Sequence, residues 1–276
     1  MNGTKNLKGN LSGESMIVGL LKHRKFIWKN ALSDLRNRYA GSMLGILWNL
    51  FNPLAQILVY TFVFSKIMVA RLPASTSHYA FAIYLCSGLL PWISFSETIL
   101  RGTNSLLENS TYLKKLPIPE QIFVAQVTVS SSLSLGISMI LLFLVNALLG
   151  GFTNINWLGL PLVLLLFQGL AYGLALALSC LNVFFRDTGQ LVSILMQIWM
   201  WVTPIVYVKD ILPVPFQKVL WINPLYAYVE SFHRIVVFGK WPMLEQWAAM
   251  VGITIMSIFF GGLLLHKLHV EIRDVL

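Results

Sequence analysis

Long apolar stretches alternate with short polar connections along most of this chain. A stretch of about 18 or more residues with few or no charges indicates a helix that crosses a membrane. Six stretches meet this condition, and Glu97 is the only Asp, Glu, Lys or Arg within any of them. They cover residues 43–65, 79–99, 121–149, 158–185, 188–208 and 246–265. The pattern predicts an all-α integral membrane protein with six transmembrane helices, residues 42–268 in all.

The polar part ahead of the first stretch divides into two segments. Residues 1–15 are expected to form a flexible cytoplasmic N-terminus. Residues 16–41 predict an amphipathic helix, because Leu21, Trp28 and Leu35 recur at helical spacing between basic side chains. A basic amphipathic helix with a tryptophan on its apolar side is typical of the membrane interface. The helix is expected to anchor the chain at this interface. In the alternative interpretation it also docks a partner.

Composition supports this class and argues against others. The 276 residues are 57% hydrophobic and 11% charged, whereas soluble domains are about 45–50% apolar and about 25% charged. So little polar surface argues against a soluble enzyme, a disordered chain and a disulfide scaffold. The two cysteines, Cys86 and Cys180, lie in apolar runs and are expected to be small core residues.

The net charge of +9 is explained by membrane orientation rather than by nucleic acid. With six spans, both termini share one side with the 100–120 loop and the 186–187 turn. Fourteen of the 20 Lys and Arg residues fall on that side, which includes the tail 269–276, and six fall on the other. Cytoplasmic loops carry the excess of Lys and Arg. We therefore expect both termini in the cytoplasm.

The cytoplasmic loop 102–120 is a candidate docking site for a soluble partner. It predicts a short apolar helix of mixed charge that ends at Pro117 and Pro119. The candidate docking residues are Leu106, Leu107, Glu108, Asn109, Tyr112, Leu113, Lys114 and Lys115. An ordinary connector is the alternative.

The stretch 209–245 on the outer side is too polar for a seventh span and too apolar for an exposed loop. It holds four prolines and an aromatic part that carries Glu230, His233 and Arg234. Because proline interrupts helices, we expect short helices that dip into the outer leaflet.

Catalytic and nucleotide-binding motifs are absent from the sequence. It has no His-Glu-x-x-His, no Gly-x-Ser-x-Gly and no Gly-x-x-x-x-Gly-Lys-Ser/Thr. We expect a transport subunit with no catalytic residue, metal or cofactor of its own, so that any ATP is hydrolysed by another chain.

Two ion pairs are expected near the cytoplasmic side. Glu97 lies four residues before Arg101, which places both on one helix face, with a relay role for Glu97 as the alternative. Arg186 and Asp187 are expected to form an ion pair that anchors the turn between two spans.

Aromatic residues are frequent in and near the spans. They suit the interfacial belts of a membrane protein or a channel whose rings pack against the C–H faces of sugars. The candidates for channel lining are Tyr60, Phe64, Trp92, Trp199, Trp201 and Tyr207. Composition leaves both interpretations open.

Four motifs, in order along the chain, resemble the membrane subunits of type-2 ABC exporters for polysaccharides. The first runs from Asp34 through Arg36, Arg38, Tyr39, Gly41, Gly45 and Trp48 to Pro53-Leu54. The others are Gly88-Leu-Leu-Pro91-Trp92, Asn182-Val-Phe-Phe-Arg186-Asp187 with Thr203-Pro204-Ile-Val-Tyr207, and Asn223-Pro224-Leu225 with Arg234. The combination is specific and covers nearly the whole chain from Asp34 onward.

The resemblance implies a homodimer of six-span subunits, each bound to one copy of a separate ATPase that holds ATP and Mg. It implies an interface helix in 16–41, a coupling helix in 102–120 and outer gate helices in 209–240. The first and fifth spans would line a pore. Pro204, Asn223, Pro224 and Arg234 are the gate candidates that go with it.

The implied cargo is polysaccharide on an undecaprenyl-diphosphate carrier in the bacterial inner membrane, with O-antigen as the first candidate. Capsule, teichoic acid or another amphipathic cargo is the alternative, and a membrane-embedded transferase is a further one. A basic entrance at Arg36, Arg38 and Arg101 would attract the lipid diphosphate. The alternative is that these arginines set the orientation and bind anionic membrane lipid in general.

Overall fold

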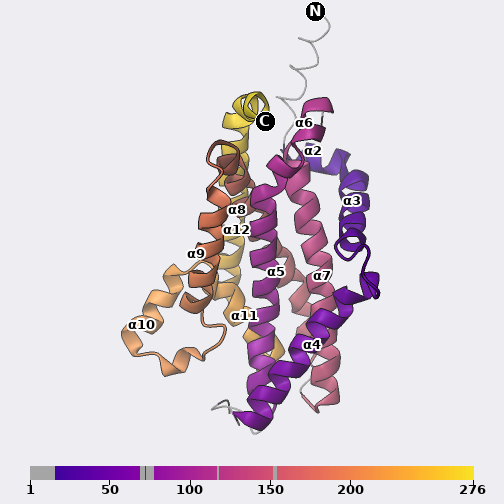
Figure 1. Ribbon diagram of the computed structural model, residues 1–276. Coiled ribbons are helices and arrows are strands. Elements are labelled where there is room, and N and C mark those ends of the chain that lie inside the picture. The colour runs from indigo at the N-terminus through magenta and orange to yellow at the C-terminus, as the bar shows by residue number, and fades with distance from the viewer. Residues whose placement is uncertain (1–15, 69–71, 73–77, 117, 152–153) are drawn as a thin grey trace, which may run out of the picture.

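The computed structural model describes residues 16–68, 72, 78–116, 118–151 and 154–276. Within these ranges the chain is helical and has no β-strand. The expected flexible N-terminus, residues 1–15, and Pro117 of the 102–120 loop lie outside the described residues. In the bundle α5 packs against both α7 and α8, and α8 packs against α12 (Figure 1).

The helices follow one another with short connections. They are α2 (Met16–Lys22), α3 (Arg24–Asn37), α4 (Trp48–Phe62), α5 (Ala80–Glu108), α6 (Ser110–Lys115), α7 (Gln121–Leu148), α8 (Leu160–Phe184), α9 (Thr188–Val202), α10 (Val214–Val219), α11 (Tyr226–Val236) and α12 (Leu244–Val275). Short 3-10 helices cover Gly45–Leu47, Ile155–Gly159, Lys209–Ile211 and Leu220–Ile222, and a π-helical turn covers Val63–Ile67.

Five of the six predicted spans are helices long and apolar enough to cross a membrane. Counted over the described residues, these are Gly45–Ile67, Ala80–Glu108, Gln121–Leu148, Ile155–Phe184 and Leu244–Val275. They fall on the predicted stretches because an uncharged apolar run of this length can form few stable structures other than a membrane-spanning helix.

The stretch predicted as a span over 188–208 is interrupted. Its helix, α9, has 15 residues and ends at Val202, which is about 22 Å at 1.5 Å per residue. The next residue, Thr203, is extended at φ −96° and ψ 133°. Extended backbone is favoured in front of a proline, and Pro204 follows. The hydropathy pattern missed this end because proline is as uncharged as its neighbours.

Helix α5 is longer than the span predicted over 79–99. It has 29 residues and continues to Glu108, so the first part of the 102–120 loop is helical and packed. Gly102, Ser105 and Leu106 are buried in this extension. Residues 100–108 contain no proline and bury one face, so the helix has no reason to end at the membrane boundary.

The core brings α11 into the bundle. Phe95 of α5 stacks on Phe167 of α8 with 4.9 Å between ring centroids. Tyr228 and Phe232 of α11 pack on Phe167 at 5.3 and 5.5 Å. Helix α11 therefore packs against protein, and the dip of the short outer helices into the outer leaflet stays a prediction.

Small residues let α8 and α12 approach closely. A Cβ at Gly173 would overlap the backbone of Ser257 and Ile258, and one at Gly261 would overlap the carbonyl of Gly173. The Ser257 hydroxyl donates to the carbonyl oxygen of Leu170 at 3.0 Å. Such contacts replace the hydrophobic effect as the driving force between helices in lipid.

Gly173→Ala is expected to lower stability by about 1–3 kcal/mol, because the added methyl group forces the two helices apart. Gly136→Ala in α7 is the matched control, since a Cβ there meets no atom within 4 Å. The control should be neutral or gain up to about 1 kcal/mol from helix propensity. Thermal unfolding of both variants in detergent measures the difference, and equal midpoints would refute the close approach of α8 and α12.

The segments expected in the cytoplasm lie at one end of the molecule. Helices α2 and α6 and the C-terminal end of α12 gather there, whereas α4 runs toward the opposite end (Figure 1). Helix α10 projects sideways from the bundle, away from that first end (Figure 1). The fold thus separates a tip formed by α6 from the outer segment, residues 209–240.

Candidate functional site

A cluster of four alternating charges fastens α3 to the bundle. Arg101 of α5 contacts Asp34 of α3 at 2.7 Å (Nη2 to Oδ1) and Glu97 at 3.1 Å (Nη1 to Oε1). Arg38, directly after α3, contacts Glu97 and also Asp34, at 3.4 Å. Asp34, Arg38, Glu97 and Arg101 are called the four-charge cluster below. Its members come from two helices that lie far apart in sequence.

Ser130 of α7 joins the cluster to a third helix. Its hydroxyl donates to Asp34 Oδ2 at 2.6 Å and accepts from Arg38 Nη2 at 3.0 Å. Burial raises the pKa of Asp34, but the bonds from Arg101 and Ser130 outweigh it, so the net pKa lies below its usual value. The carboxylate is therefore ionised at neutral pH and holds both arginines.

Two of the three arginines expected at a lipid-diphosphate entrance belong to this cluster. Arg38 and Arg101 are occupied by Asp34 and Glu97. Arg36 is exposed on α3 and forms no ion pair with any described residue. Of the three arginines, Arg36 alone is free to meet an anion without displacing a carboxylate.

The expected amphipathic helix breaks at His23 into α2 and α3. Ile27, Ala31 and Leu35 face the bundle, which packs α3 on α7. Leu21 and Trp28, predicted on the same apolar face as Leu35, are 56% and 54% exposed. They face away from the protein, where lipid would meet them.

Helix α6 forms an exposed tip at the end of α5. Asn109 links the two helices, and its side-chain amide donates to the carbonyl oxygen of Ser105 at 2.8 Å. Tyr112 is 58% exposed, and Lys114, Lys115 and Glu108 are also exposed. Leu107 is half-buried.

Two of the predicted docking residues point inward. Leu106 is fully buried and Leu113 is 3% exposed, and both pack in an apolar cluster with Ile122 and Phe123 of α7. Their exposure was predicted wrongly, because the direction of a side chain on a short helix depends on where α7 packs. Of the predicted docking residues, Glu108, Tyr112, Lys114 and Lys115 are therefore the exposed ones.

An ion pair that sequence reasoning missed ties the C-terminal end of α12 to the chain after α6. Arg273 donates to Glu120, which is 7% exposed, and to the carbonyl oxygen of Ile118 at 3.0 Å. The partners lie 153 residues apart, so no local pattern indicates the pair. The α6 tip is thus braced from both α5 and α12.

In the motif Asn182–Asp187, the asparagine makes the contacts to other helices of the described structure, and the two charged residues at its end do not. Asn182 is fully buried and donates to the carbonyl oxygen of Thr103 at 3.1 Å and to Asn104 Oδ1 at 3.0 Å. Its own oxygen accepts from the backbone N–H of Gly189 at 3.2 Å. The side chain therefore joins α8, α5 and the start of α9.

The ion pair expected between Arg186 and Asp187 does not form. Both side chains are exposed, and no salt bridge of the described part of the chain includes either one. The two side chains are neighbours in the turn and point apart. The turn is instead held by the hydrogen bonds of Asn182.

The aromatic candidates for a channel lining divide by burial. Trp92 is 5% exposed and meets Trp199 edge to face, with ring centroids 6.5 Å apart. Tyr60 and Phe64 are half-buried, and Trp201 is 63% exposed. Trp92 is thus a core residue in this conformation, whereas Trp201 faces outward from α9.

Asn223 fastens the outer segment to the end of α9. Its carbonyl oxygen accepts from Trp199 Nε1, and its amide donates to the Thr203 hydroxyl, both at 2.9 Å. Pro204 is buried beside these residues, and Pro224 is half-buried. The break after α9 and the turn before α11 are therefore one hydrogen-bonded unit.

Other predicted gate residues lie around this unit. The Tyr207 hydroxyl donates to the carbonyl oxygen of Trp201 at 3.2 Å. Arg234 Nε donates to the carbonyl oxygen of Trp241 at 3.1 Å. Tyr207 thus binds the last turn of α9, and Arg234 binds the connection between α11 and α12.

A membrane-embedded transferase, the further alternative, would need ionisable side chains grouped in one site, but Glu97, Glu230 and His233 have separate surroundings. Glu97 belongs to the four-charge cluster, and Glu230 binds Lys209 at 2.8 Å. His233 is 1% exposed and stacks on Tyr84 with 3.7 Å between the ring centroids. Burial lowers the pKa of its imidazole. The described residues contain no group of His, Cys, Asp and Glu suited to a metal ion.

Comparisons with known proteins agree with one another. A family model described as ABC-2 type transporter matches residues 26–237, from α3 to just past α11. The O-antigen export system permease protein RfbA of Klebsiella pneumoniae is 30% identical over 207 residues, 75% of this chain and 78% of that protein. Its namesake in Myxococcus xanthus is 26% identical over 246 residues, 88% and 92% of the two chains. The polysialic acid transport protein KpsM of Escherichia coli is 23% identical over 231 residues, 83% and 88% of the two chains.

Proposed function

The chain belongs to the ABC-2 type transporter family as a membrane permease whose ATP is hydrolysed by a separate subunit, and from this premise we propose that it forms the channel of an exporter for lipid-linked O-antigen. The cargo would be carried on undecaprenyl diphosphate across the bacterial inner membrane. The relatives named for O-antigen export support this cargo, and the relative named for polysialic acid transport supports capsule as the alternative. Teichoic acid or another amphipathic cargo stays a further alternative.

The exposed α6 tip is the observation that carries the proposal. Helix α5, with 29 residues, runs through the bundle, and α6 follows it directly. Tyr112, Lys114 and Lys115 of α6 are exposed, and no described part of the chain covers them. An isolated chain has no use for such a tip. A soluble ATPase docked on it could move α5 directly, and α5 lies at the centre of the core.

Two apolar faces support a second copy of the chain beside the first. Helix α4 leaves Leu58 and Phe62 52% and 60% exposed, and α9 leaves Leu191 and Leu195 60% and 57% exposed. In the proposed homodimer α4 and α9, which belong to the first and fifth predicted spans, enclose the channel. Helix α9 with its break at Pro204 then adds to the five long helices to make six crossings. Each copy binds one ATPase.

The proposed orientation places α2, α6 and the C-terminal end of α12 in the cytoplasm, in line with the excess of Lys and Arg at that end. Arg36 would then meet the lipid diphosphate first, and the four-charge cluster would lie next to the entrance. The alternative role of these arginines, general binding of anionic lipid, would give the same orientation.

The experiment is reconstitution with the partner ATPase in lipid vesicles. ATP should carry a lipid-linked O-antigen-type glycan across the bilayer, and a capsule-type glycan on its own lipid carrier should be carried less. Faster transport of the capsule-type cargo would favour the alternative, and transport of neither would refute the proposal.

A further inference from the structure

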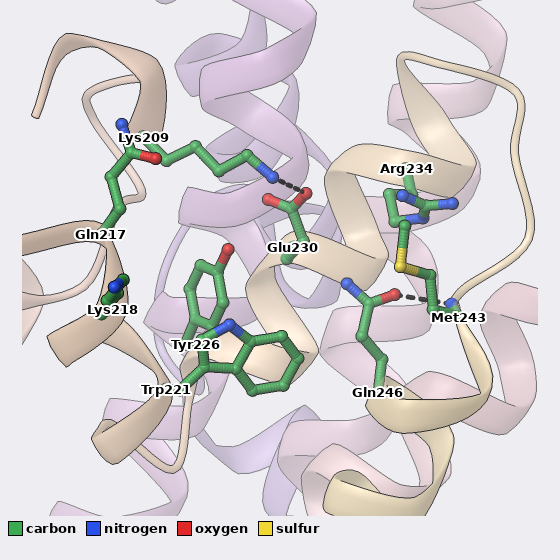
Figure 2. Close-up of a pocket in the computed structure, with 9 residues that line it drawn as sticks. All are labelled: Lys209, Gln217, Lys218, Trp221, Tyr226, Glu230, Arg234, Met243 and Gln246. Carbon is green, nitrogen blue, oxygen red and sulfur yellow. Dashed lines mark hydrogen bonds and ion pairs between the residues drawn. The ribbon is translucent and has the colours of Figure 1, made fainter. Parts of the chain in front are cut away.

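The outer segment and the start of α12 line a partly open pocket that carries charged, amide and aromatic side chains. It has a volume of about 360 Å³, within the usual range of about 300–1,000 Å³ for small-ligand sites. Short elements of the outer segment supply one wall and α11 with α12 the other. In Figure 2, Lys209 reaches across from one wall to Glu230 of the other.

Two aromatic rings lie between these walls. Trp221 and Tyr226 meet edge to face with 5.3 Å between centroids. Trp221 is 47% exposed, whereas Tyr226 is 5% exposed and packs against it. An interfacial anchor would explain an exposed tryptophan, but not the polar groups that surround this one (Figure 2).

Two amide side chains at the pocket each use one of their two polar atoms within the protein. Gln246 is only 3% exposed, and its carbonyl oxygen accepts from the backbone N–H of Met243 at 2.8 Å. Its amide nitrogen has no partner within the described structure, although it lies at the pocket wall. Gln217 donates to the carbonyl oxygen of Leu212 at 2.9 Å and keeps its own oxygen available. The remaining atoms give the site one donor and one acceptor for a hydroxyl-bearing ligand.

The charges of the pocket do not balance. Lys209 and Glu230 neutralise each other at 2.8 Å. Lys218 and Arg234 also line the pocket, and neither forms an ion pair with a described residue. Two uncompensated cations beside aromatic faces and amides select a ligand that is polar, flat-sided and negatively charged.

We propose that this pocket holds an acidic sugar unit of the exported chain on the outer side of the membrane. Trp221 packs against the C–H face of the ring, Gln217 and Gln246 bind its hydroxyls, and Lys218 and Arg234 bind its carboxylate. The proposal rests on the proposed function, since it requires a polysaccharide that emerges next to the outer segment. An anionic lipid headgroup would satisfy the cations but leave the amides unpaired.

The test measures binding of trigalacturonate and of neutral maltotriose to the permease–ATPase complex in nanodiscs, by saturation-transfer NMR up to about 10 mM. Trigalacturonate should bind, and maltotriose should bind at least about tenfold more weakly, because the charged hydrogen bonds are lost. Lys218→Ala and Trp221→Ala should each weaken trigalacturonate binding about tenfold. The matched controls are Lys240→Ala, an exposed lysine outside the pocket, and Trp28→Ala on α3. Both should bind like wild type.

The proposal is overturned if trigalacturonate does not bind, if maltotriose binds equally well, or if Lys218→Ala and Trp221→Ala match the controls. It is also overturned if an anion without a sugar ring abolishes trigalacturonate binding. The two anions to be tested are inorganic phosphate and phosphatidylglycerol in the nanodisc. ATP-driven transport measured in the same preparations separates the two claims. Export without sugar binding refutes the pocket alone, and sugar binding without export refutes the exporter alone.

Discussion

Reversing the charges of the α6 tip should abolish coupled transport while leaving the fold intact. In the double variant Lys114→Glu/Lys115→Glu, two exposed cations become anions at the proposed ATPase surface. Misplaced charge at an interface costs several kcal/mol, so we expect ATP-driven transport to fall to about a tenth or less. Thermal unfolding should not change, because both lysines are exposed and pair with no described residue.

Three further variants make this experiment specific. Tyr112→Ala should have the same effect, because exposed tyrosines often carry much of the binding energy of an interface. Lys267 is an exposed lysine near the C-terminal end of α12, which lies at the same end of the molecule as α6. The Lys267→Glu variant should transport normally. Leu113→Ala should instead lower stability, by about 2–5 kcal/mol for a buried leucine. If the lysine double variant and Tyr112→Ala both transport like Lys267→Glu, the ATPase docks elsewhere.

Arg101→Ala should release α3 from the bundle. The substitution removes the nearer of the two arginines that contact Asp34 and one of the two that contact Glu97, although each carboxylate keeps Arg38. The side chains of the cluster are between 17% and 33% exposed, so the loss lies between that of surface pairs and that of buried ones, about 1–3 kcal/mol. In the Arg101→Ala variant, a protease should also cleave the chain near α3 faster than in the wild type.

A double-mutant cycle separates the ion pair from other effects of the substitution. Asp34→Ala and Arg101→Ala should show a coupling free energy of about 1–3 kcal/mol, since the two side chains touch. Arg36→Ala, on the same helix but without an ion pair in the described part, is the control and should unfold at the wild-type temperature. A coupling near zero would mean that the cluster does not hold α3.

Asp34 also fixes the pH dependence of this contact. Its folded pKa is depressed below the usual 3.8, so the folded state binds the proton less tightly than the unfolded chain does. The stabilising contribution is therefore complete above about the usual Asp pKa and is lost as the pH falls through the lower, folded value. The four-charge cluster should stay intact across the physiological range.

The sequence predicted the helices better than their ends. Uncharged runs located five long helices because few structures other than a helix satisfy backbone groups in lipid. The end of α9 at Val202 and the extension of α5 to Glu108 were missed, since both depend on local backbone conformation and packing. A proline in an apolar run changes hydropathy little but changes the backbone of the residue before it.

Contacts between distant residues explain most of what the sequence left out of the site. The pairing of Glu97 with Arg101 follows from their spacing of four residues, but the bonds of Asp34 and Ser130 to the same cluster join three different helices. Arg273 and Glu120 likewise meet only through tertiary packing. The orientation of Leu106 and Leu113 depends on the position of α7, so exposure could not be read from the loop itself.

The most direct test of the exporter is protection of a lipid-linked glycan in proteoliposomes. The permease and its ATPase are reconstituted with the ATP sites facing outward, and undecaprenyl-diphosphate-linked O-antigen is placed in the outer leaflet. After ATP is added, an external glycosidase should leave a growing fraction of glycan intact inside the vesicles. Without ATP, or with Lys114→Glu/Lys115→Glu, all of the glycan should stay digestible. Full digestion despite ATP hydrolysis by the wild-type complex would contradict the account.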